Sequence, residues 1–100
     1  PTPFPADYNH QNWSPEYKLY RRKEFVRDLE TQLLDQGRDF YISLRGKNED
    51  HLHIKYVLMT RPAVYKMAND PAFRSTLRTI GFTKIIATDG YNDTWTIDLQ

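Results

Sequence analysis

Two histidines at positions i and i+2, His51 and His53, form the most specific chemical pattern in the chain. Residues two apart on a β-strand point to the same side, so the two imidazoles could ligate a metal together. A metal site needs a third or fourth ligand, and the remaining histidine, His10, lies in a proline-rich N-terminal segment. We therefore predict two surface histidines on a sheet, with no metal and no cofactor.

These histidines belong to a longer alternation of polar residues that could form a binding surface. The polar positions of the predicted strand pair are Tyr41, Ser43, Arg45, His51, His53 and Lys55. Some RNA-binding domains use such a sheet face, where aromatic rings stack on bases and cations meet phosphates. This face has one tyrosine and no glycine–aromatic motif of the RNA-recognition type. A solvated face, or one that pairs with a second copy, is the simpler interpretation.

A second basic group lies further along the chain. Between residues 61 and 84 the basic residues are Arg61, Lys66, Arg74, Arg78 and Lys84, and the one acidic residue is Asp70. Arg74 and Arg78 are four residues apart, so on a helix they point the same way and could collect phosphates. The alternative is a solvated helix face. The net charge of +1 predicts no strong general attraction to nucleic acid or membrane.

Catalytic patterns are scarce. The chain has no cysteine, which excludes a disulfide scaffold, thiolate zinc sites and cysteine nucleophiles. No serine lies in a nucleophile-elbow context, and every glycine is assigned to a turn, which leaves none for a phosphate-binding loop. The 89–93 loop has three oxygen-bearing side chains but lacks the ligand spacing of a calcium-binding loop. A small enzyme with an unrecognised site is therefore only the third hypothesis.

The helices and strands that carry these residues are predicted from the spacing of apolar residues and from capping and turn residues. Ser14 and Pro15 begin a helix predicted over 15–36, with an apolar stripe that includes Val26 and Leu29. The Arg21-Arg22-Lys23 run is interpreted as part of its exposed face. Strands with one apolar face follow over 40–45 and 51–58, a second helical region over 61–80, and strands over 82–88 and 94–99. Asn69-Asp70-Pro71 interrupts the second helical region, where Asp70 can cap a new helix.

The four glycines indicate how the elements repeat. Gly37 and Gly81 each follow a helix, and Gly46 and Gly90 each lie in a hairpin turn at equal spacing. We predict an α+β fold in two layers: a four-stranded antiparallel sheet with helices on one face, in the order α-β-β-α-β-β. The order also fits a ferredoxin-like sheet whose first strand has moved to the chain end, or two side-by-side hairpins.

The domain plan and the function follow from these elements. Residues 1–14 are predicted to be a coil arm or linker, with aromatic residues that either cover the core or bind a partner, and 15–100 a single domain. An αββ pseudo-repeat over 15–59 and 60–100 is an open alternative. No apolar run approaches the ~18 residues of a membrane span. We expect a non-catalytic protein-interaction or ligand-binding module, one domain of a larger protein or self-associating. The alternative is a nucleic-acid-binding domain that uses residues 61–84 or the 41–55 sheet face.

Overall fold

The computed structural model describes residues 13–99, and its first element is the long helix α1, Pro15–Asp35. Ser14 begins this helix, because its hydroxyl accepts a hydrogen bond from the Tyr17 amide at 3.1 Å. Pro15 occupies the first turn, where a helix needs no backbone donor. Beyond the helix end, Gly37 has a φ of +78°, which glycine adopts without strain. The predicted helix over 15–36 is confirmed.

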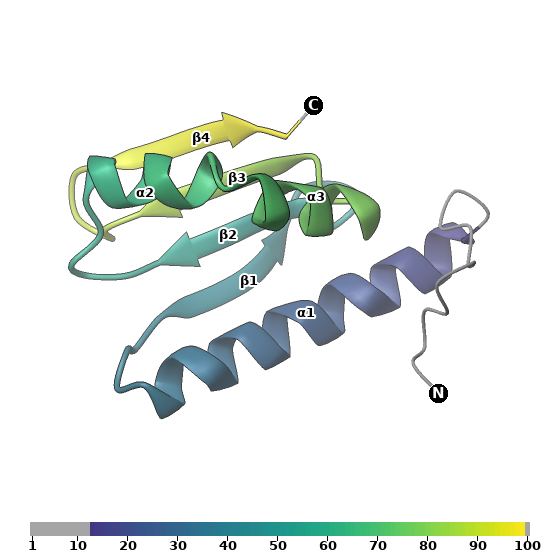
Figure 1. Ribbon diagram of the computed structural model, residues 1–100, viewed down its shortest axis with the longest axis horizontal. Helices are drawn as coiled ribbons and strands as arrows, with labels where there is room; N and C mark the ends of the chain where they lie inside the picture. Colours follow the sequence, from purple (N-terminus) through teal and green to yellow (C-terminus); the bar gives the residue numbers. More distant parts are fainter. Residues whose placement is uncertain (1–12, 100) are drawn as a thin grey trace.

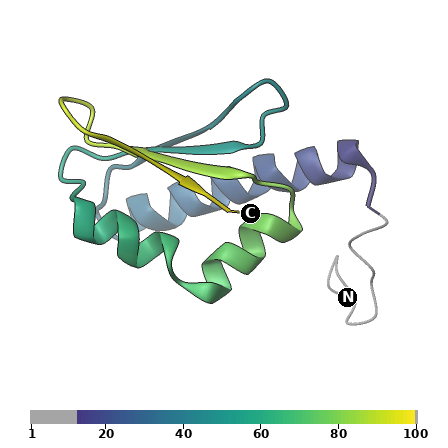
Figure 2. The same cartoon turned by 90° about the horizontal axis from the view of Figure 1, so that it is seen from above.

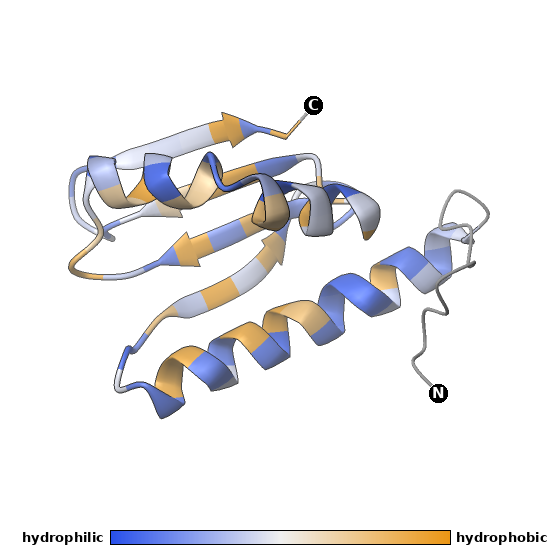
Figure 3. Ribbon diagram, viewed as in Figure 1, coloured by the Kyte–Doolittle hydropathy of each residue, from blue (hydrophilic) through white to orange (hydrophobic). Residues whose placement is uncertain are grey.

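One side of α1 is apolar and packs on the rest of the domain. Phe25, Val26, Leu29 and Leu33 are half-buried against the core. The hydropathy colouring shows this stripe turned toward the sheet, while the opposite side is polar (Figure 3). Leu34, near the end of the helix, lies outside the stripe and is 61% exposed.

The sheet has four strands in the order β1-β2-β3-β4. They are β1 (Tyr41–Arg45), β2 (His51–Lys55), β3 (Lys84–Thr88) and β4 (Thr94–Asp98). The pairs β1–β2 and β3–β4 are antiparallel hairpins, as predicted, but β2 and β3 are parallel. The sheet is therefore mixed, and the prediction of a purely antiparallel sheet is wrong. The strand order is that of two side-by-side hairpins.

Two short helices between the hairpins account for the parallel central pair. They are α2 (Arg61–Ala68) and α3 (Pro71–Thr79). Asp70 separates them, because its carboxylate caps the second helix by accepting from the Ala72 amide at 3.1 Å. Figure 1 shows the two helices together returning the chain along the length of the sheet, so β3 begins at the end where β2 began. The predicted element order α-β-β-α-β-β is corrected to α-β-β-α-α-β-β.

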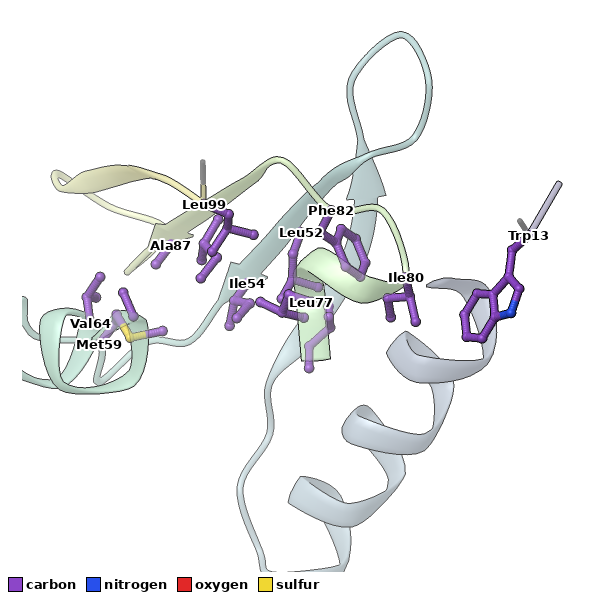
Figure 4. Close-up of a cluster of buried hydrophobic side chains, with 13 residues drawn as sticks. Trp13, Leu52, Ile54, Met59, Val64, Leu77, Ile80, Phe82, Ala87 and Leu99 are labelled. Atoms are coloured by element: carbon purple, nitrogen blue, oxygen red, sulfur yellow. The ribbon is translucent and has the colours of Figure 1, made fainter. Parts of the chain in front are cut away.

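All three helices lie on one face of the sheet, and no part of residues 13–99 covers the other face (Figure 2). The core fills the space between the two layers (Figure 4). Its buried apolar residues are Trp13, Ile42, Leu52, Ile54, Met59, Val64, Ala68, Leu77, Ile80, Phe82, Ile85, Ala87 and Leu99. In the first hairpin the inward positions are those that the alternation predicted, up to Ile54. The predicted strand over 51–58 is too long, because β2 ends at Lys55 and Leu58 is 69% exposed.

A buried arginine joins three segments that are distant in sequence. Arg22 is 7% exposed, and its guanidinium donates to the carbonyl oxygens of Glu49 (2.9 Å), Asn48 (3.1 Å) and Ile80 (3.1 Å). It therefore ties α1 both to the β1–β2 turn and to the C-terminal end of α3. Gly81 leaves room for it, since a Cβ there would lie 2.5 Å from Arg22 Nη1. The expectation that the basic run on α1 is wholly exposed is wrong at this residue.

The N-terminal arm predicted over 1–14 falls largely on residues 1–12, which lie outside the described residues. Of its aromatic side chains, Trp13 is described, and it is 7% exposed and packs edge-on against Tyr17 with ring centroids 5.3 Å apart. This tryptophan is therefore part of the core. Within residues 13–99, no helix combines the length and the apolar character needed to cross a bilayer.

Candidate functional site

The uncovered face of the sheet is the surface on which the predicted site residues meet. The register places outward side chains of the four strands in three rows. The rows are Tyr41–Lys55–Thr88–Thr94, Ser43–His53–Ile86–Thr96 and Arg45–His51–Lys84–Asp98. We call these twelve residues the open face. Five of the nine predicted site residues belong to it: Tyr41, Arg45, His51, His53 and Lys55.

The open face is cationic. Arg45, Lys55 and Lys84 carry permanent positive charge on three neighbouring strands, and Asp98 at the β4 edge is the one carboxylate in the three rows. Lys84 was not among the predicted site residues, although it was noted in the basic group. Its pairing with His51 follows from the parallel contact of β2 with β3, which the sequence pattern did not indicate. An anionic ligand on this face would be attracted from several strands at once.

The two histidines sit near the middle of this positive charge. Burial, and then the charges of Arg45 and Lys55, hold the pKa of His53 below its ordinary value of 6.5. The Nε2 atom of His51 lies 3.7 Å from an Asp50 carboxylate oxygen. Among residues 13–99, no three histidine, cysteine or acidic side chains converge on a point where a metal could bind. The pair offers hydrogen-bond donors to a ligand.

One end of the open face forms a shallow hollow of about 390 Å³ over β1 and β2. Tyr41, Arg45, His53 and Lys55 line it, with Glu30 of α1 at its rim. The Lys55 ammonium lies 5.8 Å from the centre of the Tyr41 ring, which is 58% exposed. An aromatic ring, two cations, an imidazole and the Glu30 carboxylate therefore surround a space large enough for a side chain.

The predicted basic group of the helical region does not form one surface. Arg74 donates to the carbonyl oxygens of Ala68 (2.9 Å) and Asp98 (3.0 Å), so it joins α2 to the sheet edge. Arg74 and Arg78 both line a hollow of about 480 Å³ at α3, so these two members of the group lie together. Arg61 and Lys66 are exposed on α2, where the Arg61 guanidinium lies 5.6 Å from the centre of the Tyr65 ring.

These helices cover the face of the sheet opposite the open face (Figure 2). The two basic sets that the sequence offered as alternatives therefore cannot act as one binding surface. Since one guanidinium of the helical set is already bonded to backbone carbonyls, the open face is the better-formed candidate.

Side chains from the helices also occupy the two edges of the sheet. The Glu30 carboxylate accepts from the Ile42 amide of β1 at 3.1 Å. At the other edge, Arg74 donates to the Asp98 carbonyl of β4. A partner strand needs these backbone groups, so blocking them disfavours recognition by strand addition. The open face, rather than an edge, presents side chains that the helices leave unobstructed.

Comparison of the chain with protein-family models, with curated proteins and with solved structures finds no match in any of the three.

Proposed function

We propose that this domain is a non-catalytic binding module that holds an acidic segment of a partner protein on its open face. The observation that carries the proposal is the gathering of Arg45, Lys55 and Lys84 from three adjacent strands, with both histidines between them. Complementary charge of this kind steers a partner to the surface and fixes its orientation. The helices and core then serve to hold these side chains in a fixed grid.

The central row favours a peptide over a nucleic acid. Its members are Ser43, His53, Ile86 and Thr96, which offer hydrogen bonds and one aliphatic contact. Proteins that read single-stranded nucleic acid on a sheet place stacking aromatic rings at its centre. On the open face the one six-membered ring, Tyr41, lies on the edge strand β1, and the central row offers only the smaller imidazole of His53 for stacking. A short extended acidic segment, with carboxylates facing the cations, fits this arrangement.

Charge also bears on self-association through this surface. Two copies placed face to face would bring like charges together, which costs free energy. We therefore propose a different chain as the partner of the open face. Single-stranded nucleic acid is the second candidate, supported by the Tyr41 ring and the adjacent Lys55 ammonium.

The test measures binding of a short fluorescein-labelled polyglutamate peptide by fluorescence anisotropy at neutral pH. The double variant Arg45→Gln/Lys84→Gln should weaken binding about tenfold, because two exposed ion pairs are lost. The matched control, Arg61→Gln/Lys66→Gln, removes the same charge from α2 and should change binding less than about twofold. Raising NaCl from about 0.05 to 0.2 M should also weaken binding.

A labelled oligouridylate of the same length serves as the competing probe. If it binds more tightly than the peptide and loses affinity in the same open-face variant, the nucleic-acid candidate replaces the acidic peptide. Equal losses in the open-face variant and the α2 variant would show that only net charge matters, and absence of binding at low salt would refute both candidates.

A further inference from the structure

An apolar cavity of about 320 Å³ lies on the helix side of the sheet, away from the open face. Leu29 and Leu33 of α1 form one wall, Met67 of α2 and Phe73 of α3 form the other, and Ile54 of β2 lies at its base. Ligand pockets in proteins span roughly 300–1,000 Å³ and are mostly apolar, so this volume suits a small molecule.

One end of the cavity is bounded by a rigid aromatic pair. Phe40 lines the cavity and stacks on Tyr56 with ring centroids 4.1 Å apart and planes 7° from parallel. Met59, which follows this pair in the chain, also lines the cavity and is 8% exposed. Methionine side chains are flexible and can pack around ligands of different shape, so the two methionines allow the cavity to adapt to its ligand.

A single charged group marks the mouth of the cavity. Arg38, just after the end of α1, is the one polar residue among the described residues that line it. Within residues 13–99 its exposed guanidinium makes no hydrogen bond or ion pair. The neighbouring Asp39 carboxylate instead accepts from the Tyr41 hydroxyl at 3.4 Å. The positive charge beside the apolar space is thus left for an external anion.

We propose that this cavity binds a small amphipathic monocarboxylate, a short- or medium-chain fatty acid in chemical class, with its hydrocarbon between the helices and its carboxylate against Arg38. A carboxylate matches the planar fork of a guanidinium in two parallel hydrogen bonds. The apolar walls take up the chain by removing it from water. This site is independent of the open face, so either proposal can fail without the other.

The chain carries its own reporters for the test. It has two methionines, Met59 and Met67, and both line the cavity. We would label their methyl groups with carbon-13 and titrate the full chain with octanoate, followed by NMR. Both methyl signals should shift saturably, with half-saturation at or below about 1 mM. Uncharged 1-octanol should bind about tenfold more weakly, because it lacks the carboxylate.

Three variants separate the site from surface effects. Arg38→Gln should weaken octanoate binding about tenfold, whereas Arg27→Gln, at a position with a 71% exposed side chain on α1, should leave it unchanged. Ala63→Leu fills the cavity from α2, which should abolish the methyl shifts while the fold remains stable.

Four outcomes would overturn the proposal. Absence of saturable shifts would show that the cavity does not bind octanoate. Equal affinity for octanoate and octanol would show that Arg38 does not recognise the carboxylate. Methyl signals that change with protein concentration alone would assign the cavity to a second copy. If deleting residues 1–12 creates octanoate binding that the full chain lacks, the chain's own N-terminal segment is the competitor.

Discussion

The sharpest prediction concerns the buried arginine of α1. Replacing Arg22 with Met keeps most of the side-chain stem but removes the guanidinium that binds Asn48, Glu49 and Ile80. Three backbone carbonyls then lose a charged donor. The bond to Ile80 is buried, while the other two are partly buried, so water can replace them in part.

The expected loss of stability is the difference between the hydrogen bonds that are lost and the cost of burying the guanidinium, which the variant no longer has. A hydrogen bond from a charged donor contributes about 1.5–3 kcal/mol, and water reduces this at the two partly exposed bonds. Burial lowers the pKa of Arg22 against the opposing charges of Asp50 and Glu49, which shows that burying the guanidinium has its own cost. The variant recovers that cost. We expect the free energy of unfolding to fall by about 3 kcal/mol, and Tm by roughly 12–20 °C.

Urea unfolding, followed by the fluorescence of Trp13 and Trp95, measures this change. Arg27→Met is the matched control, because the same substitution is made on the same helix at a side chain that is 71% exposed. Its free energy of unfolding should change by no more than about 0.5 kcal/mol. Arg22→Lys keeps the charge but cannot reach three carbonyls at once, so it should lie between wild type and Met.

The refuting results are specific. If Arg22→Met and Arg27→Met lose equal stability, the three carbonyl bonds contribute nothing beyond general helix effects. If Arg22→Lys matches wild type, the charge alone matters and the forked geometry does not.

Three further predictions use the same unfolding assays. Gly81→Ala should cost at least about 1 kcal/mol more than Gly37→Ala, because both have positive φ but only the former places a Cβ against Arg22; equal costs would contradict this contact. Since the pKa of His53 is lowered in the fold, the unfolded chain takes up the proton first, and stability should fall as pH drops through and below 6.5. His53→Gln should remove the part of this stability loss that comes from His53. If the variant shows the same pH dependence as wild type, His53 does not contribute to the loss. Backbone hydrogen bonds lower the pKa of Asp89 in the fold. The stability that Asp89 contributes is therefore present above pH 3.8 and is lost as the pH falls through the lower pKa of the folded state. Asp89→Ala should reduce Tm at neutral pH and flatten the acid-side decline, and a decline as steep as that of wild type would count against it.

Local features of the chain predicted the elements well, because caps and turns depend on neighbouring residues. Ser14 and Asp70 cap helices as expected, and Gly46 and Gly90 lie in the hairpin turns with positive φ. Strand alternation likewise separated inward from outward positions within β1, β2 and β4. The proposed duplication of an αββ unit stays a prediction, since equal turn geometry does not show common origin.

The candidate site was predictable within one hairpin and not beyond it. Tyr41 and Lys55 pair through a short turn, so their shared face follows from sequence. Lys84 lies opposite His51, in the row of Arg45, because β3 is parallel to β2, and alternation is the same for either strand direction. The bonds of Arg74 to the carbonyls of Ala68 and Asp98 were likewise not indicated by the sequence, whereas its place beside Arg78 in one hollow follows from their four-residue spacing.

By itself, the sequence determined where the helices begin, where the hairpin turns lie, and which side chains of the first hairpin face water. Only the tertiary structure decided the parallel central pair, the burial of Arg22, and the gathering of cations from two hairpins on the open face. The physical reason is the distance along the chain over which each interaction acts. Capping, glycine φ values and alternation act over a few residues, whereas these outcomes depend on contacts between segments separated by two helices and a turn.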